Sequence, residues 1–253
     1  MIGRFESGSR LTTLHLHPTC FMKVLEFSAY APRLVPLLIV PSLLPLMAAQ
    51  SSDGPEFATV TFTLDFPASD PSHYSISIRQ DGHGTYESSA KPGQESEDQL
   101  YESEFEVSPA NREKIFALTR QCEYFSGKID SGNRKLAFTG KKTLSYQEGQ
   151  LKHSADFNYS SVPAAQQLTV LFQSMASTLD YGRLLAYSHR YQKLALDEEL
   201  KRMEAQARNN ELNEIGAVAP VLQDIIDDAT VINVVRARAQ RILQTSKGAS
   251  AGR

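Results

Sequence analysis

The chain has 253 residues, of which 26 are basic and 29 acidic, so its formal net charge is −3 at neutral pH. This length is enough for one large domain with an apolar core, with or without an appendage. The acidic balance argues against nucleic acid as a partner, because phosphate backbones are bound by clustered Lys and Arg side chains.

An apolar segment from Leu34 to Met47 is expected to determine the compartment of the protein. It follows Lys23 and Arg33 and precedes two alanines, which is the order of regions in a secretory leader. A membrane-spanning helix needs roughly 20 apolar residues, so this segment is short for a span. We favour a cleaved leader comprising residues 1–49, with an uncleaved membrane tether or a buried core segment as alternatives. The protein is therefore expected to be exported and to work in the periplasm or outside the cell.

Residues 50–181 are predicted to form an α+β domain with an antiparallel sheet. Apolar residues alternate with polar ones from Phe57 to Phe66 and again from Tyr74 to Arg79, which is typical of half-buried strands. A turn with glycines leads to a third strand, and Leu100 to Val107 follows as another. The polar stretch between these last two strands, 88–99, is expected to be an exposed connection.

Two hairpin registers can be predicted from the requirement that one face stays apolar. In the first hairpin, a three-residue loop sets Ile78 opposite Tyr86, whereas a two-residue loop would place Tyr86 on the polar face. In the second hairpin, a two-residue turn at Glu148-Gly149 pairs Tyr146 with Leu151 and Leu144 with His153. His153 then faces the core side, either as a hydrogen-bonded core histidine or as a site residue.

Two helices are predicted to pack on this sheet, over residues 109–126 and 163–181. Ser108-Pro109 is a strong helix start, and Gly127 is expected to end the first helix as a left-handed cap. Cys122 lies on the apolar face of that helix and would be the only cysteine left after loss of the leader. A buried structural thiol is favoured over an intermolecular bridge or a reactive nucleophile.

The chain from residue 182 onward is predicted to form an antiparallel helical hairpin over 182–245, followed by a disordered tail over 246–253. Gly182 weakens the preceding helical pattern and separates the two parts. The arms of the hairpin, about 182–215 and 217–243, have narrow apolar stripes that would cover each other only partly. A protein partner or self-association through helices 182–245 is therefore expected.

The sequence contains few residue patterns that indicate a catalytic or metal-binding site. No histidines have the spacing of zinc ligands, and with one cysteine after the leader no metal and no cofactor is expected. The least weak enzyme hypothesis uses a histidine near the first hairpin as a base that Asp65, Asp70 or Asp81 would orient. The candidate site residues are His73, His83, Asp81 and His153.

The stretch from Tyr74 to Tyr187 resembles small α+β domains of exported bacterial proteins of unknown function. The strand-turn-strand from Tyr74 to Tyr86 and the helix that starts at Ser108-Pro109 carry this resemblance, which implies no catalytic residues. The preferred function is a non-enzymatic binding or structural module of the periplasm or cell envelope. The alternative is a hydrolase or small-ligand-binding protein that uses the histidines near the first hairpin.

Overall fold

The computed structural model describes residues 57–89 and 100–251. The predicted leader with its apolar core at 34–47, and most of the predicted connection over 88–99, lie outside the described residues. The described residues form a six-stranded antiparallel sheet with the order β4-β3-β2-β1-β5-β6. The strands are β1 (Thr59–Asp65), β2 (His73–Arg79), β3 (His83–Ser89), β4 (Leu100–Glu106), β5 (Lys141–Glu148) and β6 (Leu151–Phe157).

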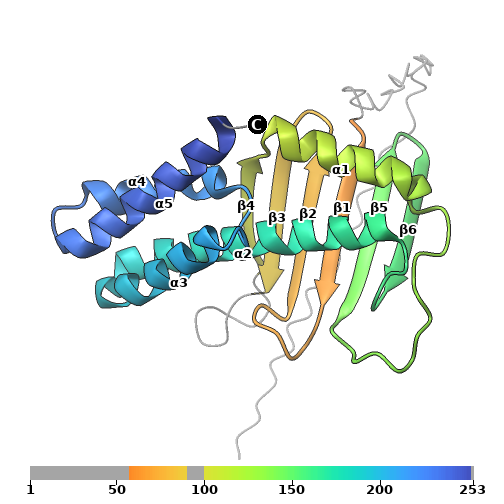
Figure 1. Ribbon diagram of the computed structural model, residues 1–253, viewed down its shortest axis with the longest axis horizontal. Helices are drawn as coiled ribbons and strands as arrows, with labels where there is room; N and C mark the ends of the chain where they lie inside the picture. The colour runs from red at the N-terminus through yellow and green to blue at the C-terminus, as the bar shows by residue number, and fades with distance from the viewer. Residues whose placement is uncertain (1–56, 90–99, 252–253) are drawn as a thin grey trace, which may run out of the picture. The chain divides into compact units, whose positions relative to one another are not determined.

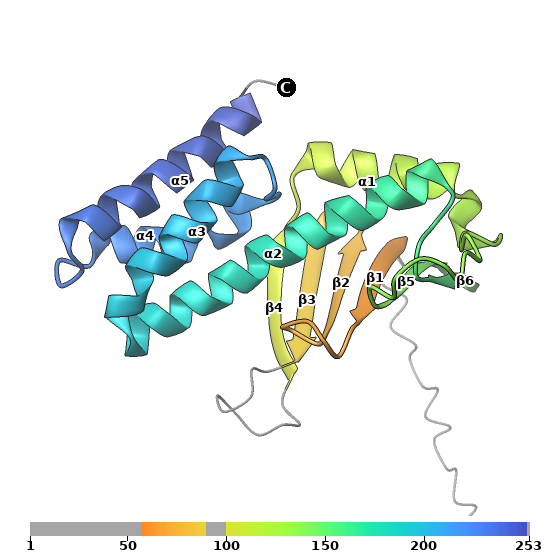
Figure 2. The ribbon, with the colours of Figure 1, turned by 60° about the horizontal axis from the view of Figure 1, so that its bottom comes forward.

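Helices α1 (Pro109–Gln121) and α2 (Pro163–Tyr191) cover one face of this sheet (Figures 1 and 2). Strands β1, β2 and β3 bury every second side chain against these helices, as the alternation of their residues requires. The ring of Phe62 on β1 stacks on that of Phe172 on α2, with 5.5 Å between the centroids. The predicted α+β class is confirmed.

The chain after α2 folds around a second apolar cluster. A 3₁₀ turn η2 (Lys193–Ala195) leads to α3 (Leu196–Arg208), and η3 (Ile215–Val218) leads to α4 (Ala219–Asp227). The last helix, α5 (Asn233–Ala251), packs against α3 and α4. The cluster includes Leu185, Leu196, Leu200, Met203, Leu222, Ile225, Val235 and Ile242. The predicted antiparallel helical packing in this part is confirmed.

The first hairpin differs from its predicted pairing by two residues. Its loop has three residues, as predicted, but these are 80–82, so Tyr86 lies opposite Ile76 and Ile78 lies opposite Gly84. A shift of two residues keeps every side chain on its face. The buried face is therefore the predicted one, although the cross-strand partners are not.

The second hairpin shows the same kind of difference. Its two-residue turn is Gly149-Gln150, so Tyr146 lies opposite His153 rather than Leu151. Gly149 takes a positive φ of 56° at the first position of this turn, a conformation that glycine adopts without steric cost. His153 is half-buried on the core side, as predicted.

Helix α1 ends earlier than predicted. Ser108 caps its start as expected, since its Oγ accepts a hydrogen bond from the Asn111 N–H at 3.4 Å. The helix stops at Gln121, and the following turn η1 (Glu123–Phe125) has three residues at positive φ. This turn, not Gly127, redirects the chain while keeping Phe125 buried.

The later helix boundaries also differ from the predicted ones. Helix α2 continues through Gly182 to Tyr191, and α5 extends to Ala251 where a disordered tail was predicted from residue 246. The second arm of the hairpin, about 217–243, was predicted as one helix, but the chain leaves the helix at Asp228, whose side chain accepts a hydrogen bond from the Thr230 N–H at 2.8 Å. Such a local bond competes with helix continuation.

Candidate functional site

The sheet face opposite α1 and α2 carries a row of ionisable side chains across four strands. Register places Asp65 of β1 beside His73 of β2 and beside Lys141 of β5. His73 Nδ1 lies 2.5 Å from Asp65 Oδ1, and Lys141 Nζ lies 2.9 Å from an oxygen of Asp156 on β6. Hydrogen bonds from Lys141 and Thr143 hold the pKa of Asp156 below its ordinary value. The row has both signs of charge and is partly open to solvent.

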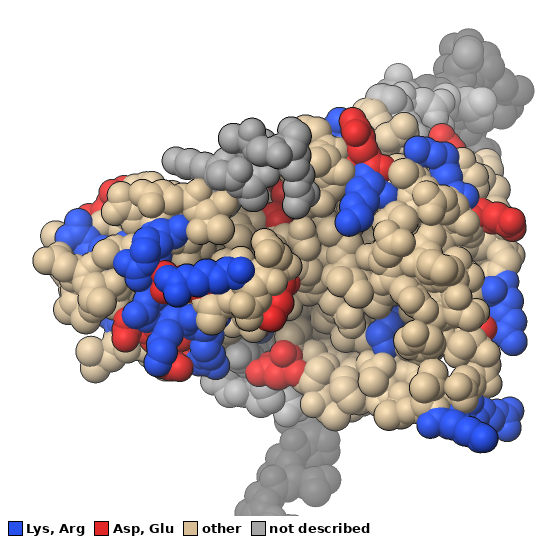
Figure 3. Space-filling model, in the orientation of Figure 1, with Lys and Arg blue, Asp and Glu red and all other residues tan. Residues whose placement is uncertain are grey.

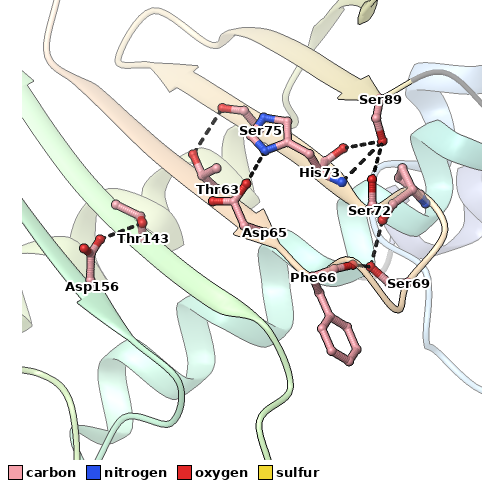
Figure 4. Close-up of polar contacts among 11 residues, drawn as sticks. Thr63, Asp65, Phe66, Ser69, Ser72, His73, Ser75, Ser89, Thr143 and Asp156 are labelled. Carbon is pink, nitrogen blue, oxygen red and sulfur yellow. Dashed lines mark hydrogen bonds and ion pairs between the residues drawn. The ribbon is translucent and has the colours of Figure 1, made fainter. Parts of the chain in front are cut away.

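Hydroxyl groups surround the His73–Asp65 pair (Figure 4). Thr63 bonds to Ser75 at 3.5 Å, and Ser89 Oγ contacts both the backbone N–H and the carbonyl oxygen of His73, at 3.3 and 3.4 Å. These contacts join neighbouring strands at the end of the sheet. The Ser89 contacts position the backbone of His73, and none of these hydroxyls supplies a reacting group.

The His73–Asp65 pair has the geometry of a base and the carboxylate that orients it. A hydrolase would also need a nucleophile bonded to the other ring nitrogen. Among the described residues, no hydroxyl or thiol is hydrogen-bonded to that nitrogen. Cys122 is buried at the end of α1, where burial raises the pKa of its thiol to about 11 and keeps it protonated. The described residues thus supply a base and the carboxylate that orients it, but no nucleophile bonded to that base.

The predicted site residues do not converge. His83 lies next to the loop at the far end of β2 from His73, with Glu104 and Glu106 each 3.9 Å from its ring. Asp81 lies in that loop and accepts a hydrogen bond from the His83 N–H at 3.1 Å. His153 lies two strands beyond β1, on β6, and its Nδ1 is buried without a partner among the described residues. Only Asp81 and His83 are neighbours.

A second candidate site lies at the end of the helical part, within the helices 182–245 that were expected to bind a partner. Tyr191, Leu194 and Ile232 are 61%, 100% and 64% exposed, and Val234 is 52% exposed. We call these four residues the tip surface. The end of α2 and the start of α5 lie at the same end of the helical part (Figures 1 and 2).

A polar cluster fastens the two segments that carry the tip surface. Lys193 Nζ lies 2.6 Å from Asp228 Oδ2, and His189 Nε2 lies 2.9 Å from the same oxygen. Lys193 also contacts the Thr230 hydroxyl at 2.5 Å. These bonds hold η2 and the loop between α4 and α5 together, so the apolar side chains that flank them are displayed in one region.

Comparison with known proteins does not assign the chain to a family. No protein-family model matches the sequence, and no curated protein matches it significantly. Within the described part of the chain, no helix is long and apolar enough to cross a membrane, and no group of three or more His, Cys, Asp or Glu side chains is placed to hold a metal ion. The function must therefore be inferred from the sites themselves.

Proposed function

We propose that the protein is an exported, non-enzymatic structural module that binds a second copy of itself through the tip surface. The exposure of Leu194, whose side chain is entirely open to solvent, carries this proposal. An apolar cluster of this kind, bordered by polar residues, is typical of a binding surface. The apolar segment 34–47, which has the pattern of the core of a secretory leader, supports export, and the incomplete surroundings of His73 make an enzyme the weaker proposal.

A second copy is the occupant that best fits the charges beside the tip surface. Arg190 lies next to it in sequence and Asp227 lies five residues before Ile232, whereas Lys193 and Asp228 bond to each other within the chain. A surface with both signs of charge can complement itself about a two-fold axis, which is how most soluble homodimers associate. An anionic membrane would instead favour a net basic surface. Figure 3 shows that Lys and Arg gather over the helical part, with acidic side chains among them.

The test uses protein recovered from cells that express the full chain. N-terminal sequencing should show a start after Ala49, and an intact leader in the membrane fraction would contradict export. Sedimentation of the recovered protein should then reveal a concentration-dependent dimer. Leu194→Glu should weaken the dimer at least about tenfold, because burial of a charge in the contact is unfavourable and 1.4 kcal/mol corresponds to tenfold.

Val170→Glu is the matched control. Val170 is 66% exposed on α2, outside the tip surface, so this variant should leave the dimer unchanged. A protein that stays monomeric at high concentration would contradict the proposal. Equal weakening by both substitutions would also contradict it, because the effect would then reflect added charge rather than a contact.

A further inference from the structure

The sheet ends at β4 on one side and at β6 on the other, and each of these strands pairs with a single neighbour (Figure 1). An unpaired strand edge presents backbone N–H and C=O groups that another strand can bind. Among the described residues, the backbone of 151–157 makes no hydrogen bond outside its ladder with β5. The outer edge of β6 is therefore open to a further strand.

The hairpin turn determines which residues of β6 direct their backbone groups outward. A two-residue turn closes on a hydrogen-bonded pair, which here is Glu148 and Leu151. Bonded and non-bonded pairs alternate along an antiparallel ladder, so the odd-numbered residues of β6 bond to β5. The N–H and C=O groups of Lys152, Ser154 and Asp156 then point away from the sheet. The side chains of the same three residues are exposed.

The charges of these residues select one pairing with a second copy of β6. Antiparallel pairing about Ser154 places Lys152 of each copy opposite Asp156 of the other, so that opposite charges face each other at both positions. The same register joins the outward N–H and C=O groups of the two strands. Pairing about Lys152 or about Asp156 would instead set like charges opposite each other, which is destabilising.

Both charged side chains are able to make this contact. Lys152 is exposed and has no ion pair within the described part of the chain. The oxygens of Asp156 contact Lys141 Nζ at 2.9 Å and the Thr143 hydroxyl at 2.7 Å (Figure 4). A carboxylate has about four acceptor positions, so Asp156 can also accept a hydrogen bond from Lys152 of the second copy.

The other edge strand offers no such pairing. Glu102, Glu104 and Glu106 are exposed on one face of β4. Antiparallel pairing of β4 with itself would oppose these carboxylates, and pairing with β6 of another copy would set Asp156 against one of them. Charged side chains are a common protection of sheet edges. A row of like charges thus protects β4, whereas β6 has one basic and one acidic residue on its exposed face.

We propose that β6 binds the β6 strand of a second copy, in antiparallel register about Ser154, and so extends the sheet from one copy into the next. This contact lies outside the tip surface and does not depend on it. Edge pairing buries little apolar surface, so the contact should form at higher protein concentration than the tip contact. A protomer with two separate two-fold contacts can join copies into assemblies larger than a dimer.

The test uses the full chain with Leu194→Glu, which weakens the tip contact. Sedimentation at increasing protein concentration should still reveal a dimer. Amide hydrogen exchange should show that this dimer protects the N–H groups of Lys152, Ser154 and Asp156, while the exchange of the Glu104 N–H stays unchanged. A protein that remains monomeric, or a dimer without protection in β6, would overturn the proposal. Failure of the tip proposal would appear separately, as equal association of wild type and Leu194→Glu.

Charge reversal tests the register. Lys152→Asp and Asp156→Lys each set like charges opposite each other, so either variant alone should weaken the dimer at least about tenfold. An equimolar mixture of the two variants restores opposite charges at both positions and should form a heterodimer. Lys114→Asp is the matched control, because Lys114 is exposed on α1, and it should leave the dimer unchanged. A mixture that fails to associate, although each variant unfolds at the wild-type urea midpoint, would refute the register.

Ser154→Pro tests the backbone contact without a change of charge. The Ser154 N–H points away from β5, so proline should preserve the hairpin, as it does elsewhere at edge positions. It removes the central N–H of the contact from both copies and should weaken the dimer at least about tenfold. A dimer of unchanged affinity in this variant would show that β6 edges do not pair.

Discussion

The Phe105 side chain lies across Gly84 on the buried face of the sheet. A Cβ atom built on Gly84 would be 2.8 Å from Phe105 Cζ and 2.9 Å from Cε1, closer than van der Waals contact permits. Residue 84 therefore has to be glycine because of a neighbouring ring, not because of a turn conformation. Gly82 serves the turn instead, with a φ of 104°.

Gly84→Ala is expected to destabilise the protein by about 1–3 kcal/mol, the usual cost of overpacking a core. Urea unfolding measures this difference. Gly127→Ala is the control, because a Cβ there meets no atom within 4 Å and the residue has no positive φ. Gly127→Ala should leave the free energy of unfolding unchanged or raise it by about a few tenths of a kcal/mol, because alanine lowers the conformational entropy of the unfolded chain. If the two substitutions have equal effects, the contact with Phe105 is not the cause.

Strand alternation predicted the face on which His153 lies but not which site residues meet. His73 and Asp65 were among several possible pairs, and the structure selects them because β1 and β2 pair in a register that sets them opposite each other. His83 has the same facing as His73 but lies at the far end of the strand pair. The sheet face on which a side chain lies follows from the local alternation of residues. Its cross-strand partners depend on the pairing register of the strands, which is determined only when the sheet forms.

At the scale of elements, α2 joins both apolar clusters as one unbroken helix of 29 residues. The sequence suggested a boundary at Gly182, because glycine disfavours helix. The structure gives that glycine another role, since a Cβ on residue 182 would lie 2.5 Å from Val218 Cγ1. Gly182 therefore marks a close approach of η3 to the helix rather than its end.

Gly182→Ala would stabilise an isolated helix by about 1 kcal/mol, through helix propensity alone. Contact with Val218 reverses the sign, and we expect a net loss of about 1–2 kcal/mol from overpacking. Val218→Ala alone should cost about 2 kcal/mol through lost burial. The double variant should lose less than the sum of the two, with a coupling of about 0.5–3 kcal/mol.

A double-mutant cycle by urea unfolding provides this measurement. Additive effects would show that η3 does not press on α2 at Gly182.

The contact between Gly182 and Val218 explains why the end of α2 could not be located from the sequence. Val218 is distant in the chain, and its packing against Gly182 leaves no local sequence pattern. The break at Asp228 was hidden for a similar reason, because apolar spacing continues through it while the carboxylate turns the backbone.

At the scale of the whole molecule, polar contacts tie the helical part to the rest of the chain and to itself. Glu214 Oε1 accepts hydrogen bonds from the Ser108 hydroxyl and from the Asn111 side chain, both at 2.7 Å, and so connects η3 with the start of α1. Asp228 connects the end of α2 with the segment before α5. The first contact links the two apolar clusters, and the second closes the far end of the helical part.

The stability of this far end should depend on acid. Hydrogen bonds from Lys193, Thr230 and His189 hold the pKa of Asp228 well below its ordinary value, which is about 3.9 in an unfolded chain. The folded state then binds fewer protons than the unfolded state, so stability rises with pH in this range. The contribution of Asp228 is present above about pH 4 and is lost as the pH falls below that value.

Asp228→Asn removes this dependence, so the wild type should be more stable than the variant above about pH 5, and the difference in unfolding midpoint should shrink as the pH falls from about 4 toward the lowered folded-state pKa. Asp227→Asn is the control, since Asp227 has one hydrogen bond within the described part of the chain, from the Gln223 side chain at 3.0 Å. This variant should keep the wild-type dependence of stability on pH. A constant gap between wild type and Asp228→Asn across this range would show that the carboxylate acts through its shape rather than its charge. A gap that grows with pH would show that charge holds the two tip segments together, and the presentation of Leu194 would then depend on the ionisation of one aspartate.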